Sequence, residues 1–351
     1  MNRLRNRGGF AWLAIVMMLA TLLTACAAPP PAAPAAPATA APAAQAQPAA
    51  TEPAKPVSDE TYVMVSNVAA HPYWIDAKKG GEDAAAELGV KWVYTGPADF
   101  NTPAQVTTME QIIATKPACI IIAALQPDAV MPAIDKAIAA GIPVLTVDTD
   151  APKSKRLTYL GTDNYQAGRV MGQRMVEVSG GQAKVGLASV PGQFNLEERI
   201  RGIKDVFAEN PGMELVAVVD NKADDAAAAT AVVAMLQGHP EINVVGSINA
   251  AGAGVASALR QTNNVGKIKA VLFDITEPII AGVEDGSVDS TLVQRTYMMT
   301  YEGAKLCYMY NHPSKYLENW QNNKFVTLPN IVDTGVMVVT KDQLAPFKTA
   351  K

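Results

Sequence analysis

The sequence predicts an α/β protein with two doubly wound lobes, each built on a parallel sheet that helices cover on both faces. Two observations support this fold class. Short β-rich apolar runs alternate with amphipathic helical stretches almost without a break from residue 61 to residue 294, as in chains of βαβ units. Several of the strand runs are apolar at consecutive positions, as in residues 119–122, which is typical of strands buried on both sides.

The first unit runs from residue 61 to residue 160. Its last predicted helix ends at Gly141, and glycine commonly follows the final turn of a helix. We expect strands at 61–67, 91–95, 118–124, 143–147 and 157–160, and helices at 73–88, 104–115 and 129–140.

The same alternation restarts after residue 160 and forms a second unit of similar size. One helix ends at Gly180-Gly181 and the next ends before Pro211, because proline cannot continue a helix. We expect strands at 183–189, 214–220, 243–249, 268–273 and 290–294, and helices at 165–178, 196–209, 225–237, 254–262 and 278–284. Two such units imply two lobes, each able to bind a ligand at the carboxyl ends of its strands.

The N-terminus has the features of an export signal. Arg3, Arg5 and Arg7 precede an apolar run at 10–23 that is too short for a comfortable bilayer span. Small residues and then Cys26 follow the run, and this stretch resembles the bacterial lipobox, in which the cysteine is acylated and becomes the first mature residue. We therefore expect a lipoprotein signal peptide at 1–25 and a lipid on Cys26.

Residues 26–59 form a segment of biased composition. Alanine, proline, glutamine and threonine make up almost all of it, so it cannot bury enough apolar surface to offset the entropy of ordering. We expect a disordered tether that reaches up to roughly 100 Å at about 3.1 Å per residue. Such a tether would keep a soluble domain near a membrane.

Composition narrows the possible partners. A formal net charge of -4 at pH 7 and the lack of a basic run argue against nucleic acid, and no later segment has the length of a transmembrane helix. The chain has three cysteines. With Cys26 lipidated, Cys119 and Cys307 remain, both in apolar or helical patterns; we favour two buried thiols over a bridge, which the sequence alone leaves open.

Polar residues follow the predicted strands where those strands end. Asp148 comes directly after one buried strand and Asp274 after another, while three further strand runs close on Asn67, Asn249 and Gln294. Any one of these could be an ordinary turn residue. Their repetition predicts a cleft that recognises a small polar ligand, because strand ends hold side chains rigidly at the sheet edge.

From residue 61 to residue 344 the chain resembles the ribose- and galactose-type periplasmic sugar-binding proteins, whose fold is shared by the ligand domains of LacI-type regulators. The segments that carry the resemblance, in the family's order, are His71-Pro72-Tyr73-Trp74, 142–148, 161–168, 199–202, Asn249, 272–274 and Gln294. The resemblance implies the type I fold, in which three chain crossovers form a hinge between the lobes. It assigns 60–162 plus 295–330 to the N-terminal lobe and 163–294 plus 331–351 to the C-terminal lobe.

The resemblance also implies a set of ligand-binding residues. They are Asn67 (or its neighbour Ser66), His71, Tyr73, Trp74, Asp148, Arg199, Asn249, Asp274 and Gln294. Two positions depart from the ribose binders: Thr149 stands where they carry an arginine, and Ala223 where they carry an aromatic residue. These departures leave the identity of the sugar open.

The chemistry of these residue types suits a sugar. Carboxylates accept hydrogen bonds from hydroxyls, guanidinium donates in a fixed fork, and Tyr73 and Trp74 offer flat apolar surface to a ring face. Two alternatives remain at this point: Trp74 as a core tryptophan at the start of its helix, and Arg199 as a surface arginine beside Glu197 and Glu198.

We expect an extracytoplasmic, lipid-anchored solute-binding protein that binds a neutral pentose or hexose and passes it to the permease of an ABC importer. The cleft would carry Asp148 and Asp274, with Asp150 as an open third candidate, against Arg199 alone, which disfavours anions. We expect a monomer with no catalytic residue and no cofactor. We also expect no metal site, because no cysteine and histidine spacing resembles one.

Two alternatives stay in view. A sugar sensor that presents its ligand state to a membrane receptor would have the same sequence features. A dinucleotide-dependent enzyme is more remote: Gly252 and Gly254 follow a strand, with Asp274 twenty residues later, but Ser257 occupies the third glycine position. A LacI-type regulator would need a DNA-binding headpiece in place of the signal.

Overall fold

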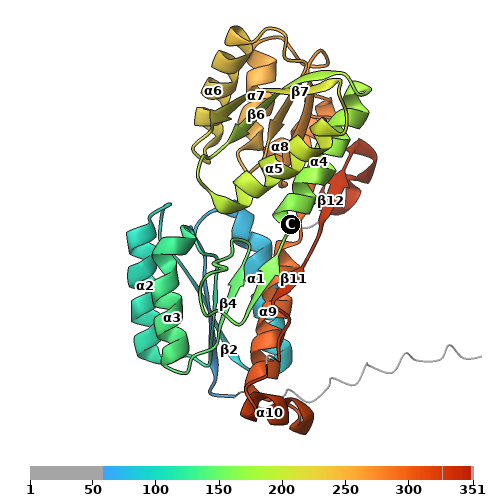
Figure 1. Ribbon diagram of the computed structural model, residues 1–351. Coiled ribbons are helices and arrows are strands. Elements are labelled where there is room, and N and C mark those ends of the chain that lie inside the picture. The colour runs from blue at the N-terminus through green and yellow to red at the C-terminus, as the bar shows by residue number, and fades with distance from the viewer. Residues whose placement is uncertain (1–57, 326, 349–351) are drawn as a thin grey trace, which may run out of the picture. The chain divides into compact units, whose positions relative to one another are not determined.

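The computed structural model describes residues 58–325 and 327–348 (Figure 1). The predicted signal peptide, Cys26 and nearly all of the tether lie outside the described residues. Within the part described, no helix is long and apolar enough to cross a membrane, and no three His, Cys, Asp or Glu residues are grouped so as to hold a metal ion.

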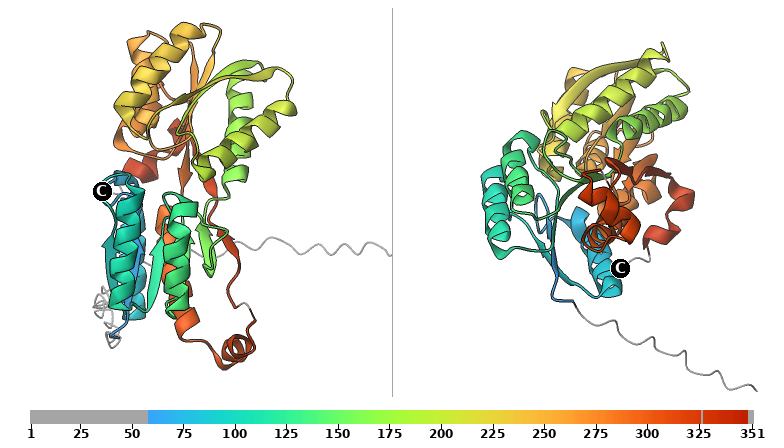
Figure 2. Two further views of the ribbon diagram at one scale, coloured as in Figure 1. Left: turned by 60° about the vertical axis from the view of Figure 1, so that its left-hand side comes forward. Right: turned by 60° about the horizontal axis from the view of Figure 1, so that its bottom comes forward.

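The first lobe is built on a parallel sheet with the strand order β11-β5-β4-β3-β1-β2. Its strands are β1 Thr61–Val65, β2 Lys91–Thr95, β3 Cys119–Ile122, β4 Val144–Val147, β5 Thr158–Gly161 and β11 Ile331–Asp333. Its helices are the short 3₁₀ helix Pro72–Trp74, α1 Ile75–Leu88, α2 Thr102–Thr115, α3 Pro127–Ala139, α9 Thr296–Asn311 and α10 Lys315–Asn322. Helices α1 and α9 lie on one face of this sheet and α2 and α3 on the other (Figure 2). Apolar residues of each pair pack against the strands.

The second lobe repeats the plan with the strand order β12-β10-β9-β8-β6-β7, in which only β12 is antiparallel to its neighbour. Its strands are β6 Ala183–Ser189, β7 Met213–Asp220, β8 Val244–Ser247, β9 Lys269–Phe273, β10 Ser290–Gln294 and β12 Val336–Val339. Its helices are α4 Asn164–Ser179, α5 Phe194–Ala208, α6 Asp225–Gly238, α7 Gly252–Gln261, α8 Glu277–Asp285, the 3₁₀ helix Lys341–Gln343 and α11 Ala345–Lys348. Helices α4 and α5 cover one face, and α6, α7 and α8 the other.

The shared strand order makes the two lobes equivalent element by element. Strand β4 of the first sheet corresponds to β9 of the second, and β5 corresponds to β10. The predicted fold class, two doubly wound α/β lobes with parallel sheets, is confirmed. The equivalence also places Asp148 after β4 and Asp274 after β9 at matching points of the two lobes.

The chain passes between the sheets three times, and the third crossover lies later than expected. Residues 331–333 form β11 and pair with β5 in the first sheet, so the predicted boundary at residue 331 is wrong. The chain passes from the first sheet to the second at Thr334 and Gly335. Gly335 has a φ of 69°, a backbone conformation that glycine adopts without strain. The segment 331–351, which the resemblance assigned to the C-terminal lobe, therefore begins with two short strands in different sheets.

Cys119 and Cys307 form a disulfide, so the prediction of two free thiols is wrong. Cys119 lies in β3 and Cys307 in α9, with their Cα atoms 6.0 Å apart. The two residues are 188 positions apart in sequence, and they meet only because α9 returns from the second lobe to pack on the first sheet.

Replacing both cysteines, Cys119→Ala with Cys307→Ala, is expected to lower the free energy of unfolding by about 2–4 kcal/mol. The bridge closes a long loop and so restricts the unfolded chain. Urea unfolding monitored by circular dichroism measures the change. A Cys26→Ser chain retains the bridge and serves as the control; equal midpoints for the control and the double variant would contradict a structural role for the bond.

Candidate functional site

A pocket lies where the carboxyl edges of the two sheets face each other. All nine residues singled out from the sequence line it, and they are joined by Phe100, Thr149, Gln193, Asn195, Leu196, Ala223 and Ala250. The cavity volume is about 80 Å³, and a buried water takes about 10–15 Å³ on this scale. The pocket therefore holds the equivalent of roughly five to eight waters, the size of one monosaccharide.

The two strand-end aspartates have the same backbone conformation. Asp148 has a φ of 61° and Asp274 a φ of 65°, in the left-handed region that aspartate tolerates better than most residues. Each backbone N–H donates to the neighbouring strand, Asp148 to Leu160 O at 3.2 Å and Asp274 to Leu292 O at 2.7 Å. The turn at each strand end thus holds a carboxylate in the pocket wall.

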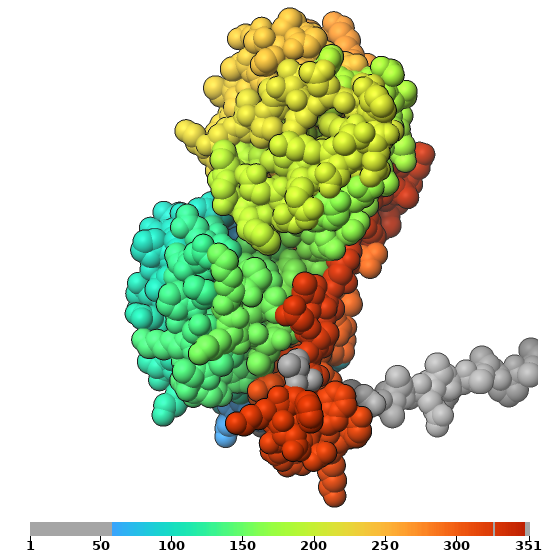
Figure 3. All heavy atoms as spheres, in the orientation of Figure 1, coloured from blue at the N-terminus to red at the C-terminus, as the bar shows by residue number. Residues whose placement is uncertain are grey.

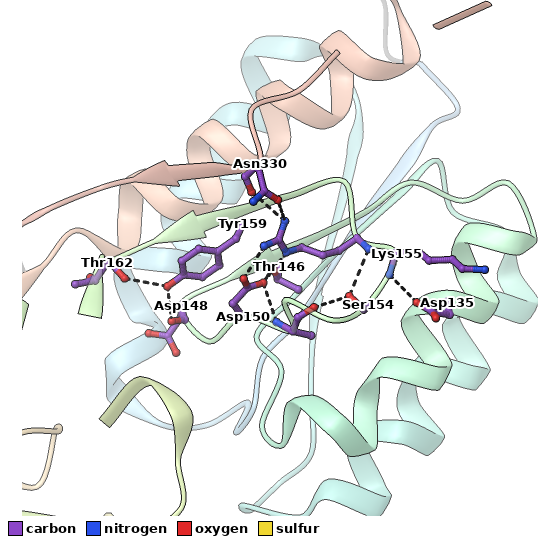
Figure 4. A network of polar contacts seen from close by, with 11 residues as sticks. Asp135, Thr146, Asp148, Asp150, Ser154, Lys155, Tyr159, Thr162 and Asn330 are labelled. Carbon is purple, nitrogen blue, oxygen red and sulfur yellow. Dashed lines mark hydrogen bonds and ion pairs between the residues drawn. The ribbon is translucent and has the colours of Figure 1, made fainter. Parts of the chain in front are cut away.

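Donors from its own lobe hold the Asp148 carboxylate. The Tyr73 hydroxyl donates to Oδ1, and the Thr149 hydroxyl donates to Oδ2 at 3.0 Å. Burial raises the pKa of Asp148, an effect that the Tyr73 bond, the charge of Arg199 and the Thr149 bond oppose. The Tyr159 hydroxyl fixes the backbone by donating to Asp148 O at 2.8 Å (Figure 4).

The Asp274 carboxylate has fewer partners than its counterpart. Gln294 Nε2 donates to Oδ1 at 2.8 Å. Burial raises the pKa of Asp274 to about 6, against the lowering effects of Arg199 and Gln294, while the charge of Asp148 adds to the rise. Ligand hydroxyls would supply the donors that this carboxylate lacks.

Arg199 is 1% exposed, which excludes the surface-arginine alternative. Its guanidinium donates to Asn164 Oδ1, Ile248 O and Gln294 Oε1, each at 2.8 Å, and it lies 4.2 Å from the centre of the Phe273 ring. Arginine has five N–H donors, so one N–H on each terminal nitrogen is left for a ligand.

A close contact between α4 and α5 places Arg199 in the site. A Cβ atom on Gly168 would stand 2.0 Å from Arg199 O, and one on Gly202 would stand 2.1 Å from Tyr165 O. Only glycine permits this approach of the two helices.

Asn249 is held by a residue that sequence analysis missed. Asn221 at the end of β7 donates to Asn249 Oδ1 at 2.7 Å, and Asn249 Nδ2 donates back to Asn221 Oδ1 at 3.0 Å. This leaves one amide N–H of Asn249 for a ligand. Asn221 is fully buried.

On the first-lobe side, Trp74 belongs both to the core and to the pocket. It is 2% exposed and packs in the apolar cluster under α1, yet it lines the pocket, and its indole N–H donates to Asn67 Oδ1 at 3.0 Å. This bond orients the Asn67 amide. His71 Nδ1 accepts from Tyr73 N at 3.2 Å, which leaves Nε2 as the position for the ring proton. Burial lowers the pKa of His71 and so favours the neutral ring, while the charge of Asp225 opposes this effect.

Two further lining residues carry chemistry that no sequence pattern indicated. The Oδ1 atom of Asn195 is buried and accepts no hydrogen bond from any described residue, which is costly unless a ligand or water donates to it. Phe100 precedes α2, is 46% exposed and lines the pocket. It supplies an aromatic surface in a pocket that has Ala223 at the expected aromatic position.

Asp150 does not belong to the pocket, contrary to one reading of the sequence. It makes a bidentate pair with Arg156, with both N–O distances 2.6 Å, and it accepts from Thr146 Oγ1 at 2.6 Å. In Figure 4 the Asp148 carboxylate points away from this network. The pocket is therefore lined by two carboxyl groups, those of Asp148 and Asp274, and by one guanidinium, that of Arg199.

Comparisons with known proteins agree on one family. A family model described as a periplasmic binding protein domain matches residues 62–312. The structure of AraP, an arabinose-binding protein from Geobacillus stearothermophilus, has 35% identity and a TM-score of 0.73, and the match covers 83% of this chain and 99% of that one. An ABC transporter solute-binding protein from Burkholderia graminis, solved with D-arabinose, has 30% identity, a TM-score of 0.76 and coverage of 85% and 99%. The xylose/arabinose-binding protein XylF of Sulfolobus acidocaldarius is 25% identical over 305 residues, 82% of this chain and 73% of the relative.

Proposed function

Since the chain belongs to the periplasmic binding protein family, whose members bind ligands and are not enzymes, we propose that it binds one neutral monosaccharide between its lobes and delivers it to an ABC importer. The observation that carries the proposal is the pocket itself: two buried carboxylates face one buried guanidinium. Two of the similar proteins, AraP and XylF, are named for binding arabinose and for binding xylose or arabinose. Pentoses are therefore the first candidate ligands.

Charge supports a neutral ligand. With Asp148 and Asp274 ionised, the pocket carries a charge of -1, and a sugar acid or phosphate would be repelled by a few kcal/mol at an effective dielectric near 20. A neutral sugar avoids this cost. Its hydroxyls would donate to the two carboxylates and to Asn195, and would accept from Arg199, Asn67 and Asn249.

The glycines that suggested a dinucleotide site have another role. A Cβ on Gly254 would stand 2.2 Å from Asp225 O, and Gly254 N donates to Asp225 Oδ1 at 3.2 Å. These contacts join α7 to α6, so the Gly254 N–H already serves helix packing, which argues against a phosphate site there.

A thermal-shift screen tests the ligand class. Arabinose, xylose, ribose or galactose at 100 times its Kd is expected to stabilise the protein by about 2.7 kcal/mol, because it binds only the folded chain. Galacturonate, ribose 5-phosphate and an amino acid serve as matched negative ligands. Stabilisation by the acids, with no response to any neutral sugar, would contradict the charge argument.

The protein is proposed to lie on the outer side of a membrane, where a lipid attached to Cys26 anchors it. Cys26→Ser is expected to abolish incorporation of labelled palmitate and to release the protein into the soluble fraction, because each buried CH₂ of an acyl chain contributes about 0.8 kcal/mol to membrane binding. Both forms should bind the same sugar. Equal membrane retention of the two chains would exclude the lipid anchor.

A further inference from the structure

Helix α10 and the turn that follows it carry a group of exposed aromatic side chains that do not line the pocket. Tyr316 is 67% exposed, Trp320 38% and Phe325 65%. The Tyr316 and Trp320 ring centres lie 5.2 Å apart and those of Trp320 and Phe325 6.4 Å apart, so the three rings, here called the aromatic patch, form one surface. No residue of α10 is buried, and Figure 3 shows this part of the chain projecting from the first lobe.

The aromatic patch lies at the edge of the first sheet opposite the pocket. Helix α9 starts two residues after Gln294, which lines the pocket, and ends where Asn311 Nδ2 donates to Ala118 O at 2.9 Å, just before β3 begins. Gln321 Nε2 in α10 then donates to Tyr310 O at 3.1 Å. Since the first sheet is parallel, α10 stands at the amino ends of its strands (Figure 1).

The described chain begins at the same edge. His312, two residues before the N-cap of α10, pairs with Glu60 at 2.9 Å, one residue ahead of β1. The segment that leads back to Cys26 therefore joins the first lobe close to the aromatic patch. A segment of that length has a reach of up to roughly 100 Å.

We propose that the aromatic patch rests on the membrane surface that holds the proposed lipid anchor. Tyrosine and tryptophan favour the membrane interface, where an apolar ring and a polar edge are both satisfied. Lys315 and Lys324, exposed at the two ends of the patch, suit anionic headgroups. A contact too weak to hold a free protein suffices here, because the anchor confines the patch near the lipid at a high effective concentration.

This contact would set the orientation of the protein. With the amino edge of the first sheet on the membrane, the pocket at the carboxyl edge faces away from it and is open to sugar in the surrounding space. A weak patch also allows release, so that the same chain can turn and meet a permease.

The test uses the chain from Cys26 onward, attached to vesicles of phosphatidylethanolamine and phosphatidylglycerol through a maleimide lipid. Cys26 is the one cysteine of the three outside the disulfide, so the attachment does not require natural acylation, and the outcome is independent of the sugar and anchor proposals. Vesicles with acyl chains brominated near the headgroup quench tryptophans at the interface. From Cys26 onward the chain has three of its four tryptophans, Trp74, Trp92 and Trp320. The emission of a Trp320→Phe chain, subtracted from that of the parent, isolates the Trp320 signal.

We expect brominated vesicles to remove most of the Trp320 emission. A Tyr316→Ser/Phe325→Ser chain should recover it, and a Val265→Ser chain, altered at an exposed apolar residue of the second lobe, should behave as the parent. Unchanged thermal midpoints and sugar affinity would show that the variants are folded. Unquenched Trp320 in a chain that sediments with the vesicles, or quenching that persists in the double variant, would overturn the proposal. An emission change that depends on protein concentration without vesicles would overturn it in favour of a second copy of the chain.

Discussion

Asp274→Asn is expected to lower sugar affinity by about 100-fold or more, because charge-assisted hydrogen bonds contribute about 1.5–3 kcal/mol each and the carboxylate has room for at least two ligand hydroxyls. Of its acceptor positions, Gln294 fills one. Asparagine keeps the size of the side chain and tolerates the left-handed backbone at this position. Isothermal titration with the sugar found in the screen measures the loss.

The same variant should leave the ligand-free protein as stable as the parent or more stable. Burial raises the pKa of Asp274 to about 6 from an ordinary 3.8, so keeping the charged form costs up to about 3 kcal/mol at neutral pH. A matched Asp150→Asn chain, which breaks a buried pair outside the pocket, should instead lose stability and keep its sugar affinity. Unchanged affinity in Asp274→Asn would remove this carboxylate from the binding site.

The sign of the pH dependence follows from the raised pKa of Asp274. The folded state holds a proton between pH 3.8 and about 6 that the unfolded state releases, so the contribution of this group to stability is full below pH 3.8 and is lost as the pH rises through 6. Sugar binding needs the ionised form and should weaken as the pH falls through 6. The pH dependence that the Asp274 carboxyl group adds to the stability and to the sugar affinity should be absent in Asp274→Asn.

The sequence predicted those parts of the fold in which local pattern and tertiary structure agree. Strands β3 and β4 are buried along their whole length, so each appears in the sequence as an uninterrupted or nearly uninterrupted apolar run. Strand β11 is three residues long and largely exposed, and its sheet depends on the turn at Gly335. No local pattern separates it from β12.

For the site, the sequence located the residues that end strands but not the contacts made over long distances in the chain. The Asn221 and Asn249 amides are 28 residues apart, and the unpartnered oxygen of Asn195 depends on how α5 packs. The disulfide between Cys119 and Cys307 also joins residues that are far apart in the sequence. Asp150 lies outside the pocket because it pairs with Arg156, a contact that the sequence pattern did not indicate. In each case the partner is supplied by tertiary packing, which periodicity and spacing do not report.

Arg199→Met is expected to lower the free energy of unfolding by about 3–5 kcal/mol, the usual cost of removing one member of a buried charged group. Methionine fills much of the same volume but removes the guanidinium donors from Asn164 Oδ1 and Ile248 O, and it leaves Gln294 Oε1 with the Thr162 hydroxyl in place of two donors. The two pocket carboxylates also lose their cation, so the pKa of Asp274 should rise further. Sugar affinity should fall with stability, because the remaining guanidinium donors are lost.

Arg201 provides the matched control for this prediction. It lies two residues further along α5, is largely exposed and pairs with Glu198 at 2.6 Å, so Arg201→Met should cost less than about 1 kcal/mol. Combining Arg199→Met with Asp274→Asn should cost less than the sum of the two single changes, since one of the stranded carboxylates is then neutral. Urea unfolding of the four chains measures both effects. A loss in Arg199→Met no greater than that in Arg201→Met would show that the buried guanidinium does not hold the pocket together, and strict additivity in the double variant would show that it does not compensate the charge of Asp274.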